Sequence, residues 1–235
     1  MESFEYVRPG TVNEAVALLA EKPGRARALA GGTDLLVQMK VGRRQVDRVV
    51  DIKGIDELSE IHVNADGSVT IGAAVPANKV YSHPAVVAGY AGIIDSASIV
   101  GGIAIQGRAS LGGNLCNSAP SGDTIPSLAA AGAIAIIAGP SGRREVPVGE
   151  FCTGPGQNCL MPNELLVAIR LPAPKPRSGG HYLRFIPRNE MDIAVAGAGA
   201  WVALDEHGVV TEARVVLASV APVPLAVPEA AAAVV

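Results

Sequence analysis

Two glycine-rich segments carry the residue types in this chain that could bind an anionic ligand. The first reads A-G-G-T-D-L-L over residues 30–36, and the second reads S-L-G-G-N-L-C-N-S-A-P-S-G-D over residues 110–123. Each places backbone amides without Cβ hindrance beside a hydroxyl group, an arrangement that suits a phosphate. Two such segments in one chain, both also carrying Asn or Asp, indicate a dinucleotide that is held from two sides.

The first segment follows a predicted strand, and its glycines let the backbone turn sharply beside a ligand. Thr33 supplies a hydroxyl group. Asp34 suits a phosphate poorly, so it either caps the following helix or binds a ribitol or ribose hydroxyl. A simple turn between strand and helix is the alternative, and this segment taken alone favours it.

The second segment is denser in polar groups. Ser110 stands beside glycine amides that can hold an oxyanion, and Asn114 and Asn117 add donors and acceptors within reach. Asp123 stands where a helix would begin, so its carboxylate is either an N-cap or a partner for a ribose hydroxyl. A glycine-rich surface loop is the alternative, which this density of polar side chains disfavours.

The sequence lacks several common catalytic and binding motifs. It has neither the spacing of a Rossmann motif nor the lysine of a Walker loop, and no Ser or Cys has a recognisable His partner. Three cysteines are too few for an iron–sulfur cluster, and the four scattered histidines lack metal-ligand spacing. If the chain is an enzyme, a cofactor therefore carries its chemistry.

The composition is that of an ordinary globular protein. Of 235 residues, 49% are hydrophobic and 17% charged, which suffices for a sizeable core in one or two domains. A net charge of −3 gives no footprint for nucleic acid, and we expect the arginine pairs 43–44 and 143–144 in solvated turns. No run reaches the roughly 18–20 apolar residues of a membrane span. The cysteines are sparse, and the acidic N-terminus lacks the apolar core of a signal peptide. We therefore expect a cytoplasmic location.

Hydrophobic periodicity and turn residues predict a β-α-β-α-β unit at the N-terminus and an antiparallel sheet at the C-terminus. Residues 11–14, T-V-N-E, form a capping box at the start of the first helix, and the proline-rich residues 172–180 form a linker. Strands are expected at 4–7, 27–30, 46–52, 61–63, 69–71, 133–137, 145–148, 165–171, 181–186, 193–204 and 209–219, and helices at 12–22, 34–39, 84–100, 123–131 and 228–235.

Both glycine segments resemble the FAD-binding medium subunit of the molybdenum hydroxylases, of the carbon monoxide dehydrogenase and xanthine dehydrogenase type. Two further runs share this resemblance: G-G-I-A-I-Q at 101–106 and R-N-E-M-D-I-A at 188–194. The resemblance covers nearly the whole chain. It implies an α+β fold with a FAD-binding domain of the vanillyl-alcohol-oxidase (PCMH) type over 1–175, in two α/β lobes at about 1–55 and about 56–175. Residues 176–235 would form a C-terminal domain with a three-stranded antiparallel sheet, truncated relative to the family.

This resemblance implies noncovalent FAD, with the first segment around the pyrophosphate and ribitol and the second closing on the pyrophosphate. Asp123 would bind the adenosine ribose, and Leu166 would pack near the adenine or the flavin. Arg184 stands where relatives often carry a Lys near the isoalloxazine, where a positive charge favours the anionic reduced flavin, or it is an exposed strand residue. The expected cofactor-binding residues are Arg27, Ala28, Leu29, Ala30, Gly31, Gly32, Thr33, Asp34, Leu35, Ala109, Ser110, Gly113, Asn114, Asn117, Asp123, Leu166 and Arg184.

The resemblance further implies an electron-transfer subunit without catalytic side chains of its own. A small partner subunit would carry [2Fe–2S] clusters and a large one the molybdenum cofactor, in a dimer of heterotrimers. Electrons would pass from the clusters through FAD to NAD, a quinone or oxygen. Two alternatives are a stand-alone FAD-dependent oxidoreductase, for which we identify no substrate-facing acid or base, and a scaffold with a decayed FAD site, which the intact Gly, Ser, Asn and Asp positions disfavour.

Overall fold

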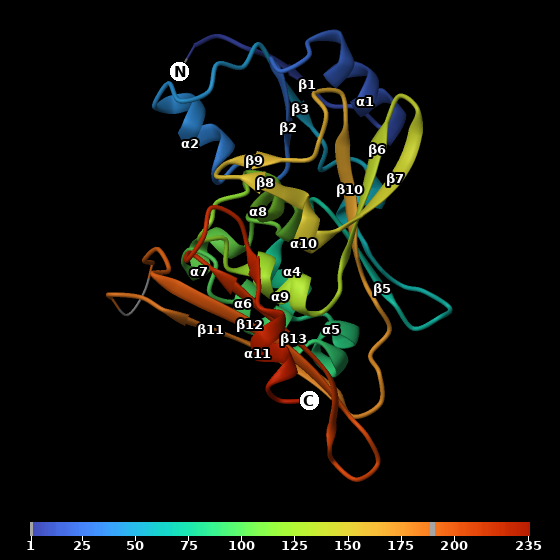
Figure 1. The fold of residues 1–235 in the computed structure, drawn as a ribbon. Coiled ribbons are helices and arrows are strands. Elements are labelled where there is room, and N and C mark those ends of the chain that lie inside the picture. Colours follow the sequence, from blue (N-terminus) through green and yellow to red (C-terminus); the bar gives the residue numbers. More distant parts are fainter. Residues whose placement is uncertain (1, 189–190) are drawn as a thin grey trace.

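The N-terminal part of the chain forms a small parallel sheet flanked by two helices (Figure 1). The computed structural model describes residues 2–188 and 191–235. The three strands pair in the order β1-β3-β2, and both pairings are parallel. This confirms the predicted β-α-β-α-β unit, whose elements are β1 (Glu5–Val7), α1 (Val12–Glu21), β2 (Ala26–Leu29), α2 (Leu35–Lys40) and β3 (Arg48–Asp51).

The first helix begins at the predicted capping residues. The Thr11 hydroxyl accepts a hydrogen bond of 3.2 Å from the Glu14 amide, which satisfies one of the free amides of the first turn. The Glu14 carboxylate accepts from the amide of Gly10 at 2.7 Å rather than from that of Thr11 itself. The buried face of α1 then packs its apolar side chains over the neighbouring sheet strands.

A five-stranded antiparallel sheet forms the middle of the molecule. Its order is β4-β5-β10-β6-β7, and the central strand β10 (Leu165–Leu171) is buried on both faces. Leu165 and Val167 pack against the N-terminal unit, whereas Leu166 and Ile169 pack against a layer of helices. The strand therefore fixes the two halves relative to one another. Its partners are β4 (Ile61–Val63), β5 (Val69–Gly72), β6 (Ile134–Gly139) and β7 (Gly142–Pro147).

The helical layer differs from the prediction at one place. The single helix predicted over 84–100 is wrong, because the chain breaks at Tyr90. The Tyr90 side chain is buried and donates its hydroxyl to the Pro172 carbonyl at 2.7 Å, which holds the break in place. The helices of this part are α3 (Asp56–Ser59), α4 (Ala77–Tyr81), α5 (Pro84–Gly89), α6 (Ala91–Ala97), α7 (Ile103–Gln106), α8 (Leu111–Asn117), α9 (Thr124–Ala130) and α10 (Val148–Phe151), followed by the two-stranded ribbon β8 (Cys152–Gly154) and β9 (Gln157–Asn158).

The C-terminal sheet has four strands rather than the predicted three. The fourth, β14 (Leu225–Ala226), is only two residues long, too short for a periodic signal. The sheet also starts within the predicted linker, since Ser178 to Gly180 already pair with β12. The other strands are β11 (Ser178–Phe185), β12 (Ala196–Leu204) and β13 (Val210–Ala218), and the short helix α11 (Pro228–Ala232) follows.

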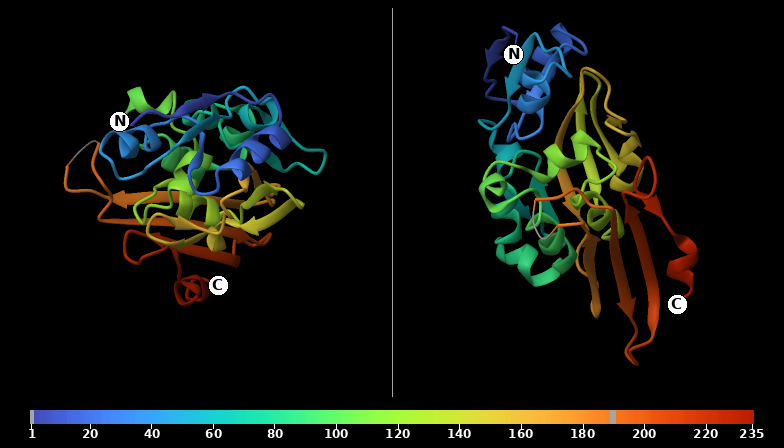
Figure 2. Two further views of the ribbon diagram at one scale, coloured as in Figure 1. Left: turned by 90° about the horizontal axis from the view of Figure 1, so that it is seen from above. Right: turned by 90° about the vertical axis from the view of Figure 1, so that its left-hand side faces the viewer.

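The C-terminal sheet packs on helices α6 and α9 of the middle part, so the molecule is elongated, with the N-terminal unit and the C-terminal sheet toward opposite ends (Figure 2). Gly199 of β12 lies directly against α9, because a Cβ atom at this position would come within 2.7 Å of the Pro126 carbonyl group. This close approach brings the first strands of the C-terminal sheet beside the start of α9.

Candidate functional site

A cavity of about 440 Å³ lies between the N-terminal unit and the middle part. Its walls come from β2 and the loop after it, from α8, and from the segment that leads into β10. This size is in the usual range for a ligand pocket. The predicted residues that line it are Arg27, Ala28, Leu29, Ala30, Gly31, Gly32, Thr33, Asp34, Leu35, Ala109, Ser110, Gly113, Asn114, Asn117 and Leu166.

The first glycine segment lies against the second because Gly31 lacks a side chain. A Cβ atom on Gly31 would fall 1.7 Å from the Arg108 carbonyl oxygen, an impossible contact. The Arg108 Nε in turn donates to the Gly31 carbonyl at 3.3 Å. Gly32 has a φ of +77°, which L side chains rarely adopt. The sharp turn inferred from the sequence is therefore required by the approach of the two segments.

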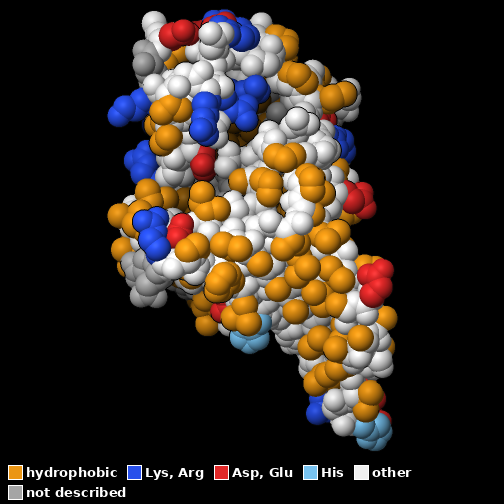
Figure 3. Space-filling view, turned by 60° about the vertical axis from the view of Figure 1, so that its left-hand side comes forward, with side chains coloured by type: hydrophobic (Ala, Val, Ile, Leu, Met, Phe, Trp, Pro, Cys, Tyr) orange, Lys and Arg blue, Asp and Glu red, His pale blue; other side chains and the backbone are white. Residues whose placement is uncertain are grey.

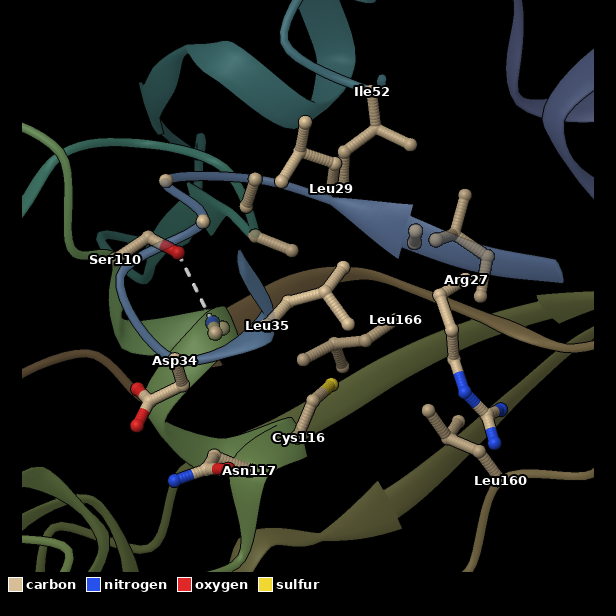
Figure 4. Close-up of a pocket in the computed structure, with 18 of the residues that line it drawn as sticks. Arg27, Leu29, Asp34, Leu35, Ile52, Ser110, Cys116, Asn117, Leu160 and Leu166 are labelled. Atoms are coloured by element: carbon tan, nitrogen blue, oxygen red, sulfur yellow. Dashed lines mark hydrogen bonds between the residues drawn. The ribbon is translucent and has the colours of Figure 1, made fainter. Parts of the chain in front are cut away.

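Much of the second segment is helical, because α8 runs through it (Figure 4). The Ser110 hydroxyl is the N-cap of this helix and accepts from the Gly113 amide at 3.0 Å. Gly112 lies directly on the middle sheet, where a Cβ would come within 2.4 Å of the Ala73 carbonyl oxygen. Sequence reasoning missed this helix because two glycines in its first turn lower helix propensity.

Two asparagines of α8 hold the neighbourhood of the cavity together. The Asn114 Oδ1 accepts from the Thr124 hydroxyl at 2.7 Å, which ties α8 to the start of α9. The Asn117 Oδ1 accepts from the Gln38 amide at 2.9 Å, which ties α8 to α2 of the N-terminal unit. Each side chain keeps its amide NH₂ group as a further donor, so both can serve a ligand as well as the fold.

The floor of the cavity is apolar. Leu166 and Leu160 lie beside the Cys116 side chain, whose sulfur points into the cavity (Figure 4). Burial raises the pKa of the Cys116 thiol to about 12, so it is protonated at neutral pH. A protonated thiol acts here as a small apolar wall group and not as a nucleophile.

An ion pair beside the cavity was not foreseen from the sequence. Arg144, expected in a solvated turn, donates to both carboxylate oxygens of Glu164 at 2.8 and 2.7 Å. The same carboxylate accepts from the Met161 amide at 2.8 Å, so it fixes the loop before β10. The Arg144 guanidinium holds the pKa of Glu164 below its usual range. The signal in the sequence is only two charged residues twenty positions apart, with no pattern to connect them.

The two remaining predicted residues, Asp123 and Arg184, lie outside the cavity wall and contact one another. Arg184 on β11 donates to Asp123 at 3.0 Å, and Tyr182 on the same strand donates its hydroxyl to the other carboxylate oxygen at 2.8 Å. Asp123 occupies the N-cap position of α9 as the sequence suggested, but its side chain makes no capping hydrogen bond. The exposed-strand alternative for Arg184 is wrong, because its side chain is only 10% exposed.

Burial raises the pKa of Asp123, and the nearby Tyr182 and Arg184 oppose that shift. Burial and the Asp123 carboxylate both raise the pKa of Tyr182, which keeps this hydroxyl a donor at physiological pH. The three side chains thus form a hydrogen-bonded cluster at the contact between α9 and the C-terminal sheet.

Known protein families match both parts of the chain. A family model described as the FAD binding domain in molybdopterin dehydrogenase matches residues 2–174, and one described as the CO dehydrogenase flavoprotein C-terminal domain matches residues 181–235. The chain is 35% identical to the xanthine dehydrogenase FAD-binding subunit of Escherichia coli O157:H7, over 94% of this chain and 75% of that protein. It belongs to the FAD-binding medium subunits of the molybdenum hydroxylase family.

Other proteins of this family also match the chain. The carbon monoxide dehydrogenase medium chain of Hydrogenophaga pseudoflava is 35% identical over 94% of this chain and 76% of that protein. Among solved structures, reconstituted CO dehydrogenase from Oligotropha carboxidovorans superposes with a TM-score of 0.94 at 30% identity, covering 100% of this chain and 81% of that chain. The chain is therefore an oxidoreductase subunit of this family with FAD as its cofactor.

The cavity has features that fit the FAD of this family. One end is apolar, as an aromatic ring system requires, and the glycine segments bring two stretches of backbone without side chains to its edge. The Nε of Arg27, which lines the cavity, is buried and has no hydrogen-bond partner among residues 2–188 and 191–235. A buried donor of this kind is expected to be satisfied by a ligand or by water.

Within the described part of the chain, no group of three His, Cys, Asp or Glu side chains is arranged to hold a metal ion. All three cysteines are free thiols there. Across the same residues, none of the helices combines the length and apolar character that crossing a membrane would demand.

Proposed function

We propose that this chain holds FAD noncovalently between its N-terminal unit and its middle part and serves as the electron-transfer subunit of a molybdenum hydroxylase complex. The observation that carries the proposal is the cavity, which gathers fifteen of the seventeen expected residues from three separate stretches of sequence. Bound FAD would supply reversible storage of two electrons. The side chains of this chain bind, orient and shield it.

We propose the following division of labour within the site. Residues 27–35, with Ala109, Ser110, Gly113, Asn114 and Asn117, hold the pyrophosphate and ribitol, and Leu166 packs beside a ring system. The Asp123–Arg184 pair lies outside the wall of this cavity, at the contact with the C-terminal sheet, and Arg184 would place a fixed positive charge near the isoalloxazine from there. The adenosine ribose role expected for Asp123 stays a proposal, and both oxygens of this carboxylate also accept hydrogen bonds within the chain, from Tyr182 and Arg184.

We further propose a two-domain arrangement of the vanillyl-alcohol-oxidase type, with a FAD-binding domain over 1–175, in lobes of about 1–55 and 56–175, and a C-terminal domain over 176–235. The limits of the matched families and the separate sheets support it. Free thiols at all three cysteines are consistent with a cytoplasmic location.

The proposed partners are a small subunit with [2Fe–2S] clusters and a large subunit with the molybdenum cofactor, in a dimer of heterotrimers. Several relatives carry names of multi-subunit dehydrogenases, which supports this expectation. Electrons would leave toward NAD, a quinone or oxygen. The test is purification of the tagged chain at native levels from its own cells, with iron and molybdenum determined in the purified material.

Co-purification of iron and molybdenum with the flavin is the result that the complex requires. A flavoprotein that purifies alone, free of both metals, and that reduces its FAD with a substrate of its own would contradict the complex. That outcome would favour the stand-alone FAD-dependent oxidoreductase instead.

A further inference from the structure

A second cavity of about 510 Å³ opens beside the first and is lined by basic and polar residues. Figure 3 shows Lys and Arg side chains gathered beside a hollow in this region. Five residues line both cavities, so the two are continuous. Its lining contains three arginines and no carboxylate, and it consists of Arg27, Gln38, Arg43, Arg44, Gln45, Asn117, Pro155 and Gly156.

The positive charge of the Arg27 guanidinium has little compensation in the wall of the second cavity. Its Nε is buried without a hydrogen-bond partner, and no carboxylate of the described residues lies within ion-pair distance of its guanidinium. Burial lowers the pKa of Arg27, and the nearby charge of Arg44 lowers it further. Two neighbouring positive charges without an anion between them cost free energy, and an anionic ligand would remove that cost.

Arg44 is held in position beside Arg27 by polar contacts instead of by a carboxylate. Its Nε donates to the Gln38 Oε1 at 2.6 Å, and the Gln38 amide donates to Asn117 at 2.9 Å. Gln38 therefore ties Arg44 to α8, the helix of the second glycine segment. Half of the chain's arginines do pair with a carboxylate, namely Arg25, Arg48, Arg143, Arg144, Arg170, Arg184 and Arg188.

We propose that Arg44, together with Arg27, forms a binding site for phosphoryl oxygens at the mouth of the FAD cavity. The inference rests on the proposed function for the identity of the ligand, which would be the diphosphate of FAD. Guanidinium groups bind phosphate oxygens through paired N–H donors, which matches two arginines on one cavity wall. The same chemistry would also take a separate phosphate-bearing molecule, and the experiment distinguishes these two sources.

The experiment measures binding of FAD, riboflavin and inorganic pyrophosphate to the flavin-free chain by calorimetry, for the wild type and for Arg44→Gln. Lys40→Gln is the matched control, because Lys40 is exposed, lines neither cavity and lies four positions before Arg44 in the sequence. We expect Arg44→Gln to weaken FAD about tenfold or more, with riboflavin unchanged and a shallower salt dependence. Lys40→Gln should change FAD binding by less than about twofold.

The source of the phosphoryl group follows from competition. If pyrophosphate competes with FAD, the occupant of the site is the FAD diphosphate. If pyrophosphate instead binds the FAD-loaded chain without displacing FAD, and does not bind Arg44→Gln, the arginines form a separate phosphate site. FAD and pyrophosphate binding that are both unchanged in a correctly folded Arg44→Gln would overturn the inference while leaving the proposed function intact. Failure of the wild type to bind FAD would instead overturn the proposed function.

Discussion

At the scale of single residues, Gly31 decides whether the two glycine segments can meet. Its backbone lies so close to the Arg108 carbonyl that no side chain fits, and the same contact closes one wall of the cavity. The residue thus serves the site through its lack of a side chain.

Substitution Gly31→Ala should therefore impair both stability and cofactor binding. We expect a loss of about 3 kcal/mol in the free energy of unfolding, because the Cβ must push Arg108 away. FAD affinity should fall by more than about tenfold as the segments separate. Urea unfolding and FAD titration provide the two measurements.

The matched control is Gly107→Ala, one residue before Arg108, where a Cβ meets nothing within 4 Å and φ is negative. This variant should keep FAD affinity within about twofold of the wild type. Equal FAD affinity in Gly31→Ala and Gly107→Ala would show that the contact between the segments does not shape the site.

The two glycine segments and the family resemblance together indicated most of the cavity wall, but not the partners of its side chains. Ser110, Asn114 and Asn117 line the cavity as predicted, yet each also bonds to protein: a helix amide, Thr124 and Gln38. These partners lie on different elements, so the local sequence contains no signal for them. Arg44 was missed for the same reason, since its proximity to Arg27 depends on the parallel pairing of β2 with β3.

At the scale of elements, the loop before β10 depends on the ion pair between Arg144 and Glu164. That loop supplies Leu160 and Met161 to the cavity, and the Glu164 carboxylate binds the Met161 amide directly. The pair is well placed to contribute stability, because the Glu164 side chain is only 12% exposed.

The contribution of Glu164 should depend on pH in a defined direction. Its pKa in the folded chain is lowered from 4.5, so the ionised form is favoured by folding. The stability difference between the wild type and Glu164→Gln should be fully present above about pH 5, at about 1–2 kcal/mol, and should vanish as the pH falls through the lowered pKa. Urea unfolding of both proteins across this pH range measures it.

A stability difference that stays constant down to low pH, or that grows on acidification, would contradict this assignment. Gln at position 164 keeps one acceptor for the Met161 amide, so the comparison isolates the charge of the carboxylate.

Elements marked by a periodic pattern, a cap or a turn pair were predictable, and elements without such a mark were not. The strand at β10 and the helix α1 were located because a run of apolar residues and a capping box mark them. By contrast, α8 carries two glycines and β14 has two residues, and both form because tertiary contacts compensate for weak local preference. The break at Tyr90 has a similar origin, since its hydroxyl bonds a residue 82 positions away.

At the scale of the whole molecule, the C-terminal sheet packs closely against the middle part at Gly199. We expect Gly199→Ala to lower the free energy of unfolding by about 2 kcal/mol, because the added methyl group meets the Pro126 backbone on α9. The Asp123–Tyr182 hydrogen bond lies at the same contact between α9 and the sheet, so it should weaken as well. Thermal unfolding followed by circular dichroism measures the effect.

Gly179→Ala is the control within the same sheet, where a Cβ meets nothing within 4 Å. It should leave the melting temperature nearly unchanged. Similar destabilisation by both substitutions would mean that the loss comes from glycine positions in the strands and not from the contact with α9.

The central claim, that this chain is a noncovalent flavoprotein, is tested most directly by the absorption spectrum of the purified chain before and after heat treatment. We predict flavin absorption in the visible range, with intact FAD released into the supernatant at about one molecule per chain. A colourless protein that takes up no added FAD would contradict the account, and flavin that stays with the denatured chain would contradict noncovalent binding.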